Sequence, residues 1–280
     1  MRTRLLMTII LAALVLAVVV GWRDTMRVTL TFAEVPAPGL TRPVTVLHTS
    51  DLHGATFGEG QARVASLLEG THYDAAVING DHLSSTRGDI DPALDLLAVL
   101  REHTDIVFVT RGNHDTAPAI DTLVAHGAVP LRADDPPVPF AVDAGNLLAV
   151  PSITAGDVPT DTAVALAVGH YPLTGEVTRA RTGAGATTTL YLFGHTHGGQ
   201  IRLPLLGALW APGEVGADGL RPARTAVENF FPELRGRTIA GLGGADAVHT
   251  HISRGLGTQG IRLRLLAPAE MTVITLMPVL

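Results

Sequence analysis

The sequence predicts an α/β fold with two sheets packed face to face and helices outside them, preceded by an apolar N-terminal helix. Three observations support this prediction. Short β-branched runs alternate with helix-like segments in the first half of the chain, strands dominate the second half, and Leu5–Trp22 is apolar apart from Thr8. Alternating strands and helices are typical of α/β proteins, whose binding sites form beyond the carboxyl ends of the strands.

The N-terminal run is just long enough to cross a bilayer as a helix. A cleaved signal peptide would have a shorter apolar core and a small-x-small site, which Val18–Trp22 does not provide. A buried core helix, the other alternative, should show a polar face. We therefore expect residues 1–22 to be a single-pass anchor in the cell membrane, and the flanking positive charges weakly favour an extracytoplasmic location for the remainder.

After the anchor, Arg27–Glu34 alternates as a strand does, and Val35–Pro43 is rich in Pro and Gly, which predicts a linker. We therefore divide the chain into residues 1–22, a linker and first strand at 23–43, and one domain at 44–280. The domain's predicted strands are Val44–Leu47, Ala75–Ile78, Ile106–Val109, Phe140–Val142, Leu147–Val150, Ala163–Val168, Thr189–Phe193, Ala247–Ser253 and Met271–Met277. Its predicted helices are Gln61–Glu69, Asp91–His103 and Pro118–His126, and Leu203–Arg237 is expected to be a long ordered loop with a short helix.

The composition limits the possible partners. The net charge of −6 gives no basic surface for nucleic acid, so we expect none to bind. With no cysteine among the 280 residues, thiolate ligands are excluded, and any metal must be held by His, Asp, Glu, Asn or backbone oxygen. The 12 histidines are a generous supply of such ligands.

Five polar clusters follow predicted strands and contain most of the candidate ligands. They are Asp51-x-His53, Gly80-Asp81, Gly112-Asn113-His114-Asp115, Gly169-His170 and Gly194-His195-Thr196-His197. Glycine beside a ligand permits a sharp turn, and residues two apart at a strand end point the same way. Oxygen and imidazole donors suit Mn, Fe, Zn or Co better than a structural zinc site.

In their order and spacing over about residues 44–280, these clusters resemble the calcineurin-like metallophosphoesterase superfamily. Two further segments, Gly194–Pro204 and Ser253–Thr258, resemble its bacterial YkuE/YaeI-type branch. The resemblance implies a four-layer α-β-β-α sandwich with two divalent metal ions. Asp51, His53 and His197 would bind one ion, Asn113, His170 and His195 would bind the other, and Asp81 would bridge them.

The resemblance also implies catalytic roles. His114 would be the substrate-facing histidine. From general chemistry, we expect the adjacent carboxylate of Asp115 to orient it. Arg254 could either contact a substrate phosphate, which Arg recognises bidentately, or brace its loop through a salt bridge. His82 is expected to be structural or to face the substrate. His48 is expected to be a hydrogen-bonded core residue, and His249 and His251 to lie on a non-functional strand face.

The expected function is hydrolysis of a phosphate ester by a monomeric enzyme. The anchor favours a lipid-linked phosphodiester or pyrophosphate of the cell envelope. One alternative is a UDP-diacylglucosamine-type pyrophosphohydrolase, because the resemblance extends to such enzymes. Others are a non-enzymatic metal-binding scaffold and a metal-regulated envelope sensor.

Overall fold

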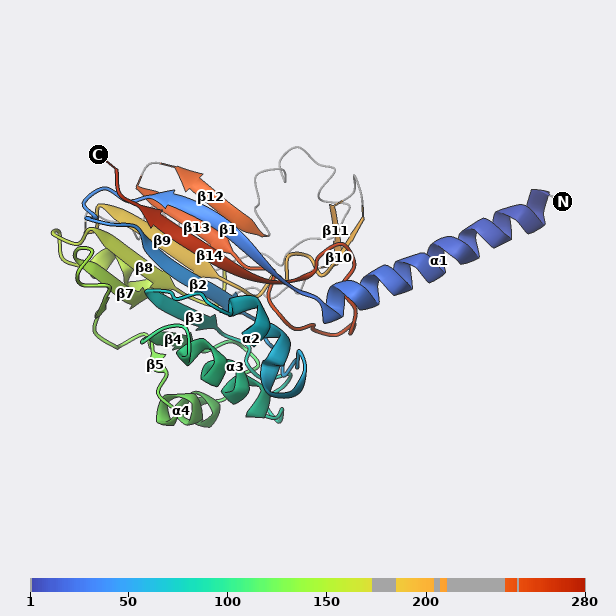
Figure 1. The fold of residues 1–280 in the computed structure, drawn as a ribbon, viewed down its shortest axis with the longest axis horizontal. Coiled ribbons are helices and arrows are strands. Elements are labelled where there is room, and N and C mark those ends of the chain that lie inside the picture. The colour runs from blue at the N-terminus through green and yellow to red at the C-terminus, as the bar shows by residue number, and fades with distance from the viewer. Residues whose placement is uncertain (1, 173–184, 204–206, 211–239, 246, 280) are drawn as a thin grey trace.

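The structure, a computed structural model, describes residues 2–172, 185–203, 207–210, 240–245 and 247–279. Two six-stranded mixed sheets form its body, and the N-terminal helix projects away from them (Figure 1). At the start of the predicted loop Leu203–Arg237, strand β10 (Ile201–Leu203) pairs antiparallel with strand β11 (Gly207–Trp210), which lies within the loop. The short helix predicted there lies outside the described residues.

The first sheet has the strand order β1-β14-β2-β3-β4-β5. Its strands are β1 (Val28–Pro36), β14 (Ala269–Met277), β2 (Val44–Ser50), β3 (Ala75–Asn79), β4 (Val107–Thr110) and β5 (Val129–Pro130). Strands β2 to β5 run parallel to one another, whereas β14 is antiparallel to β2. The carboxyl ends of β2, β3 and β4 therefore meet at one edge.

The second sheet has the strand order β12-β13-β9-β8-β7-β6. Its strands are β12 (Gly241–Ala245), β13 (Val248–Ile252), β9 (Thr188–Phe193), β8 (Val164–Val168), β7 (Leu147–Pro151) and β6 (Val138–Phe140). Strands β7, β8, β9 and β13 are parallel, and the two outer strands are antiparallel to their neighbours. The predicted α/β class with two mixed sheets and helices is confirmed.

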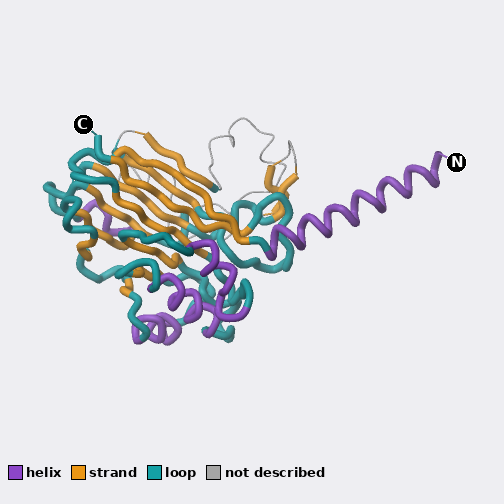
Figure 2. The backbone as a smooth tube through the Cα atoms, in the orientation of Figure 1, coloured by secondary structure: helices purple, strands orange, loops and turns teal. Residues whose placement is uncertain are grey.

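Three helices cover the outer face of the first sheet, as Figure 2 shows. They are α2 (Ala62–Leu68), α3 (Asp91–Arg101) and α4 (Ala117–Ala125), each within two residues of its predicted bounds. Helix α4 begins where the Thr116 side chain accepts a hydrogen bond from the Ala119 backbone, which is an N-cap. The 3-10 turn η1 (Glu59–Gln61) leads into α2.

Apolar side chains fill three layers. One cluster lies between the helices and the first sheet, and a second lies between the sheets, where Phe108 and Phe140 pack edge to face at 5.9 Å. The third cluster lies on the outer face of the second sheet, beside the 3-10 turn η2 (Ser152–Asp157). Both faces of the second sheet are therefore buried, as expected for a mostly parallel sheet.

The first strand belongs to the domain rather than to a linker. β1 extends over Val28–Pro36 and pairs in parallel with β14 along its whole length. Residues 35 and 36, predicted as linker, are thus part of the sheet. A parallel neighbour so distant in sequence leaves no local signal, so the sequence did not show that this strand pairs with the last one.

Helix α1 (Arg2–Met26) contains the predicted anchor and runs one turn past it. Its segment Thr3–Met26 is long and apolar enough to cross a membrane, although a signal sequence would pass the same test. Most of its side chains are exposed, yet Gly21 and Asp24 near its end are buried against the domain. We call Gly21–Met26 the foot of α1.

Candidate metal centre and active site

The predicted ligands converge because their strands end at the same edge of the two sheets. Asp51 follows β2, Asp81 follows β3 and Asn113 follows β4, all in the first sheet. His170 follows β8 and His195 follows β9 in the second sheet. Face-to-face packing then brings the five loops together, as expected beyond the carboxyl ends of parallel strands.

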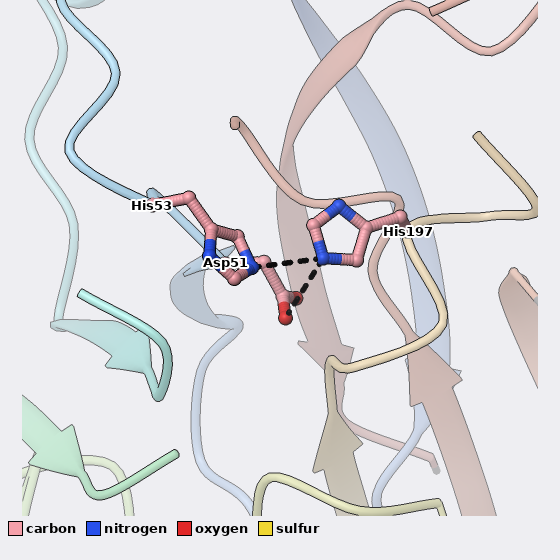
Figure 3. A group of neighbouring side chains, drawn as sticks. All are labelled: Asp51, His53 and His197. Atoms are coloured by element: carbon pink, nitrogen blue, oxygen red, sulfur yellow. Dashed lines mark hydrogen bonds and ion pairs between the residues drawn. The ribbon is translucent and has the colours of Figure 1, made fainter. Parts of the chain in front are cut away.

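One group of ligand atoms comes from Asp51, His53 and His197, all of which are buried. The Nε2 atoms of His53 and His197 lie 3.0 Å apart, and His197 Nε2 lies 3.7 Å from Asp51 Oδ1 (Figure 3). Two ligand atoms bound at a right angle to one ion at about 2.1 Å would be about 3.0 Å apart. This group therefore has the spacing of one coordination sphere.

A second group comes from Asp81, His170 and His195. His170 Nε2 lies 3.1 Å from His195 Nδ1 and 3.0 Å from Asn113 Oδ1. The structure thus places Asn113 with this group, as the resemblance implied.

Asp81 lies between the two groups. Its Oδ2 atom is 3.5 Å from His53 Nε2 and 3.3 Å from His170 Nε2. Its other oxygen accepts a hydrogen bond of 2.8 Å from the His114 backbone nitrogen. One carboxylate oxygen therefore faces a histidine of each group, which is the position of a bridging ligand.

The backbone at the ligands is strained. Asp51, His53, Asp81, His195 and His197 all have positive φ angles, between 48° and 67°. This left-handed conformation costs a residue other than glycine roughly 1–2 kcal/mol. Such strain clusters at functional sites, where the surrounding structure holds it in place.

Two glycines allow the loops to come this close. A Cβ atom at Gly112 would collide with the backbone nitrogen and carboxylate of Asp81. A Cβ atom at Gly194 would collide with the Asp51 carboxylate, which accepts hydrogen bonds of 2.9 and 3.0 Å from His195 N. The glycines that the sequence places beside the ligands are thus required by close approach.

Burial sets the charge of the site. It raises the pKa of Asp51 to about 6 and lowers the pKa values of His53 and His195 to about 4. Burial alone would lower the pKa of His170, but its hydrogen bond and charge interaction with Asp81 raise it. At neutral pH, His53 and His195 therefore carry the free lone pair that a metal requires.

The donors fit divalent metal ions. The two groups supply only carboxylate oxygen, amide oxygen and imidazole nitrogen, a set that suits Mn, Fe, Zn or Co. Two buried carboxylates, Asp51 and Asp81, lie among histidines that are largely neutral. A cation would compensate this negative charge, since buried charges are stable only when paired.

His114 lies at the edge of the two groups and is half-buried, with its ring 5.0 Å from the ring of His53. Asp115, predicted to orient it, does not bind that ring. The Asp115 oxygens accept hydrogen bonds from His82 Nδ1 at 2.7 Å, from Leu83 N at 3.1 Å and from Gly112 N at 2.9 Å. The prediction for Asp115 is therefore wrong: it braces the two loops behind the site.

His82 is the partner that Asp115 does have, and it is completely buried. This places it in the structural role, one of the two roles left open for it. The loops after β3 and β4 lie side by side. The buried Asp115 carboxylate therefore finds its hydrogen-bond donors on both of them, as a buried polar group requires.

The remaining candidates have structural contacts. Arg254 Nη1 lies 3.2 Å from Glu270 Oε2, which is the loop-bracing alternative, and contact of Arg254 with a substrate stays a prediction. His48 Nδ1 lies 2.9 Å from His251 Nδ1, so these two histidines meet between the sheets. His249 is buried on the same strand as His251.

Three residues near the site were not predicted. Gln259 Nε2 lies 2.6 Å from His114 Nε2. Gln200 and Arg264 are completely buried and brace the chain around Gln259 and His197. Gln200 lies in the segment Gly194–Pro204, but the sequence analysis assigned it no role. No local sequence pattern marked Gln259 or Arg264 as site residues.

Together, the two-sheet sandwich and the ligand groups at its strand ends define an α/β protein built to bind divalent metal. A family model described as calcineurin-like phosphoesterase matches residues 44–199. The chain belongs to the calcineurin-like phosphoesterase family. The family match and the two groups of candidate metal ligands together support the conclusion that the protein is a metal-dependent phosphoesterase.

Two individual proteins are similar to the chain. It is 35% identical over 89 residues to the uncharacterized metallophosphoesterase YkuE of Bacillus subtilis, which confirms the resemblance to the YkuE-type branch. That alignment covers 31% of this chain and only 23% of the relative's length. The solved structure of phosphopantetheinyl hydrolase from Mycobacterium tuberculosis is similar with a TM-score of 0.38 and 15% identity, over 81% of this chain and 97% of that one.

Proposed function

We propose that this protein uses two divalent ions to hydrolyse a phosphodiester or pyrophosphate bond of a lipid-linked substrate at a membrane surface. The observation that carries the proposal is Asp81, whose one oxygen lies within 3.5 Å of a histidine from each ligand group. When bound, a pair of such ions supplies Lewis-acid polarisation of the phosphoryl group and a nucleophile at neutral pH.

The protein's own groups complete the site. His114 lies beside both ligand groups, with its backbone nitrogen bonded to Asp81 and its side chain half-buried. An imidazole there stabilises charge on the phosphoryl group or protonates the leaving oxygen. A scaffold without activity would not need the full set of donors or the strained backbone that holds them.

The foot of α1 supports a membrane-bound substrate. Thr25 Oγ1 accepts a hydrogen bond of 2.8 Å from Arg264 N, and the Arg264 side chain reaches the backbone oxygen of His197 at 3.4 Å. A single arginine therefore connects the end of the apolar helix to a proposed metal ligand. If α1 spans a bilayer, the site lies at the end of the domain that faces the membrane.

The test uses the full chain purified in detergent. Bound metals are quantified, and cleavage of bis-p-nitrophenyl phosphate is compared with cleavage of p-nitrophenyl phosphate and of a nucleotide-lipid pyrophosphate, followed by phosphorus NMR. Two ions per chain and faster cleavage of the diester or pyrophosphate are expected. Metal binding without cleavage of any of the three would overturn the proposal in favour of the scaffold.

A further inference from the structure

A loop of eleven residues, Leu256–Leu266, connects the foot of α1 to the active site, and we call it the active-site loop. At the foot, Arg264 N donates to Thr25 Oγ1 and Leu266 N donates to Asp24 Oδ2, both at 2.8 Å. Asp24 is buried, and a Cβ at Gly21 would lie 2.9 Å from Leu263 Cγ. The helix is thus docked on the loop with a close fit.

Two buried side chains hold the loop's shape from inside. Gln200 Nε2 donates to the backbone oxygens of Gln259 at 3.3 Å, Leu263 at 3.1 Å and Ile261, while Gln200 Oε1 accepts from Gln259 N at 3.0 Å. Arg264 donates to the backbone oxygens of Gly257 at 2.9 Å, Ala267 at 3.0 Å and Arg254 at 2.8 Å. Since a buried Arg with several acceptors is costly to disturb, the loop is rigid where it meets the site.

The braced loop carries Gln259 to His114. The amide nitrogen of Gln259 lies 2.6 Å from Nε2 of His114. An amide that donates to Nε2 keeps the proton of a neutral imidazole on Nδ1 and fixes the plane of the ring. The neighbouring carboxylate of Asp115 does not do this, because its oxygens are bonded to His82, Leu83 and Gly112.

We propose that Gln259 is the positioning residue of His114, and that the foot of α1 holds the active-site loop that presents it. The N-terminal helix is then part of the scaffold of the site as well as a tether. This inference rests on the proposed function only in treating His114 as the residue that acts on substrate.

The first experiment is a double-mutant cycle in the full chain. Gln259→Met keeps the length of the side chain and removes the amide, and should lower kcat about 10- to 100-fold with KM within about threefold, part of the effect of removing a general acid. Because Gln259 acts through His114, the double variant with His114→Ala should lose no more activity than His114→Ala alone. Arg262→Gln, an exposed change in the same loop, is the control and should leave kcat unchanged. Losses that multiply in the double variant would overturn the proposal.

A second readout does not depend on turnover. In protein with ¹⁵N-labelled histidine, the Nε2 resonance of His114, identified by its absence in His114→Ala, should shift in Gln259→Met and stay in place in Arg262→Gln. An unshifted resonance would overturn the contact whether or not the protein is an enzyme. A shifted resonance in a protein without phosphoesterase activity would instead leave the contact standing and refute the proposed function.

The third experiment tests the foot. Asp24→Ala combined with Thr25→Val removes both acceptors, whereas Arg23→Gln changes an exposed residue of the same turn. Amide hydrogen exchange at Ile261–Leu266 should become at least about tenfold faster in the double variant only, and its kcat should fall as in Gln259→Met. Unchanged exchange, or faster exchange with unchanged kcat, would refute the coupling between helix and site.

Discussion

At the scale of single residues, the site combines a strained backbone with side chains that contact both ligand groups. Asp81 illustrates both, since its φ is 49° and one of its oxygens faces histidines of both ligand groups. If each ligand group binds an ion, as we propose, removing Asp81 would leave two cations facing one another with no carboxylate between them.

We therefore predict that Asp81→Ala abolishes loading of both ions, and that Asp81→Asn, which keeps the shape and loses the charge, binds metal far more weakly than the native chain. Elemental analysis after exposure to Mn measures this directly. Circular dichroism checks that both variants are folded. An undiminished content of two ions in Asp81→Ala would contradict the bridging position.

His114 should behave differently because its side chain lies beside the ligand groups and contacts Gln259. His114→Ala should lower turnover by roughly two to four orders of magnitude, the range for loss of a general acid. Metal content should be retained. Steady-state kinetics combined with elemental analysis decides the matter, and a parallel loss of metal would reassign His114 as a ligand.

The sequence allowed the seven proposed metal ligands to be named because each lies in a short cluster after a strand. It did not reveal the partners of polar groups that come from distant loops. Asp115 is next to His114 in the chain, yet it bonds His82 on the neighbouring loop, and Gln259 reaches His114 across 145 positions. Contacts of this kind depend on how distant loops pack against one another, and a local sequence pattern cannot predict that.

At the scale of elements, the two sheets are connected by buried polar groups as well as by apolar packing. Asn79 on β3 donates to the backbone oxygens of Gly169 at 2.9 Å and Leu192 at 3.0 Å in the other half of the sandwich, and accepts from Thr110 at 2.7 Å. His48 on β2 meets His251 on β13 nearby. These bonds fix how the strand ends of the two sheets face one another.

We predict that the burial of His48 and His251 makes stability depend on pH. Burial lowers the pKa of His251 to about 4 and the pKa of His48 well below its usual value. Both rings bind protons near pH 6.5 once unfolded, so their contribution is fully present above that pH and is lost as the pH falls toward 4. For His251 alone the loss is about 3 kcal/mol.

Urea denaturation of the metal-free protein between pH 4 and 7 measures this effect. The double variant His48→Gln, His251→Gln should show a flatter dependence of the free energy of unfolding on pH than the native chain. His126→Gln, a change at an exposed histidine, is the control and should leave the slope unaltered. An equally steep slope in the double variant would rule out the pair as the cause.

Strand boundaries were predictable where the pattern was local and failed where the partner was distant. Ala75–Ile78 lies within β3, because a β-branched run buried on both faces has a clear signal. β12, Gly241–Ala245, has almost no strand propensity and was not predicted. It forms because β13 offers it an antiparallel partner, a contact that depends on tertiary structure.

At the scale of the whole molecule, the hydrogen bonds between the foot of α1 and the active-site loop attach the apolar helix to the domain. The full chain should float with phospholipid vesicles in a density gradient, and a chain beginning at residue 27 should not. Cleavage of α1 as a signal sequence would leave the chain unbound in both cases, so mass spectrometry of the protein recovered from cells distinguishes the two uses of the helix.

A site held close to a bilayer should favour substrates in the same bilayer. The foot is joined through Arg264 to the backbone of His197, so if α1 spans a bilayer, the site stays close to the membrane surface. We predict that the protein, placed in vesicles with a lipid pyrophosphate, cleaves it at least about tenfold faster than the same lipid in separate vesicles, because tethering raises the effective concentration. Soluble bis-p-nitrophenyl phosphate should be cleaved equally in both mixtures. Phosphorus NMR of the lipid measures the ratio, and equal rates for the lipid in the two arrangements would show that the helix does not direct the site toward the membrane.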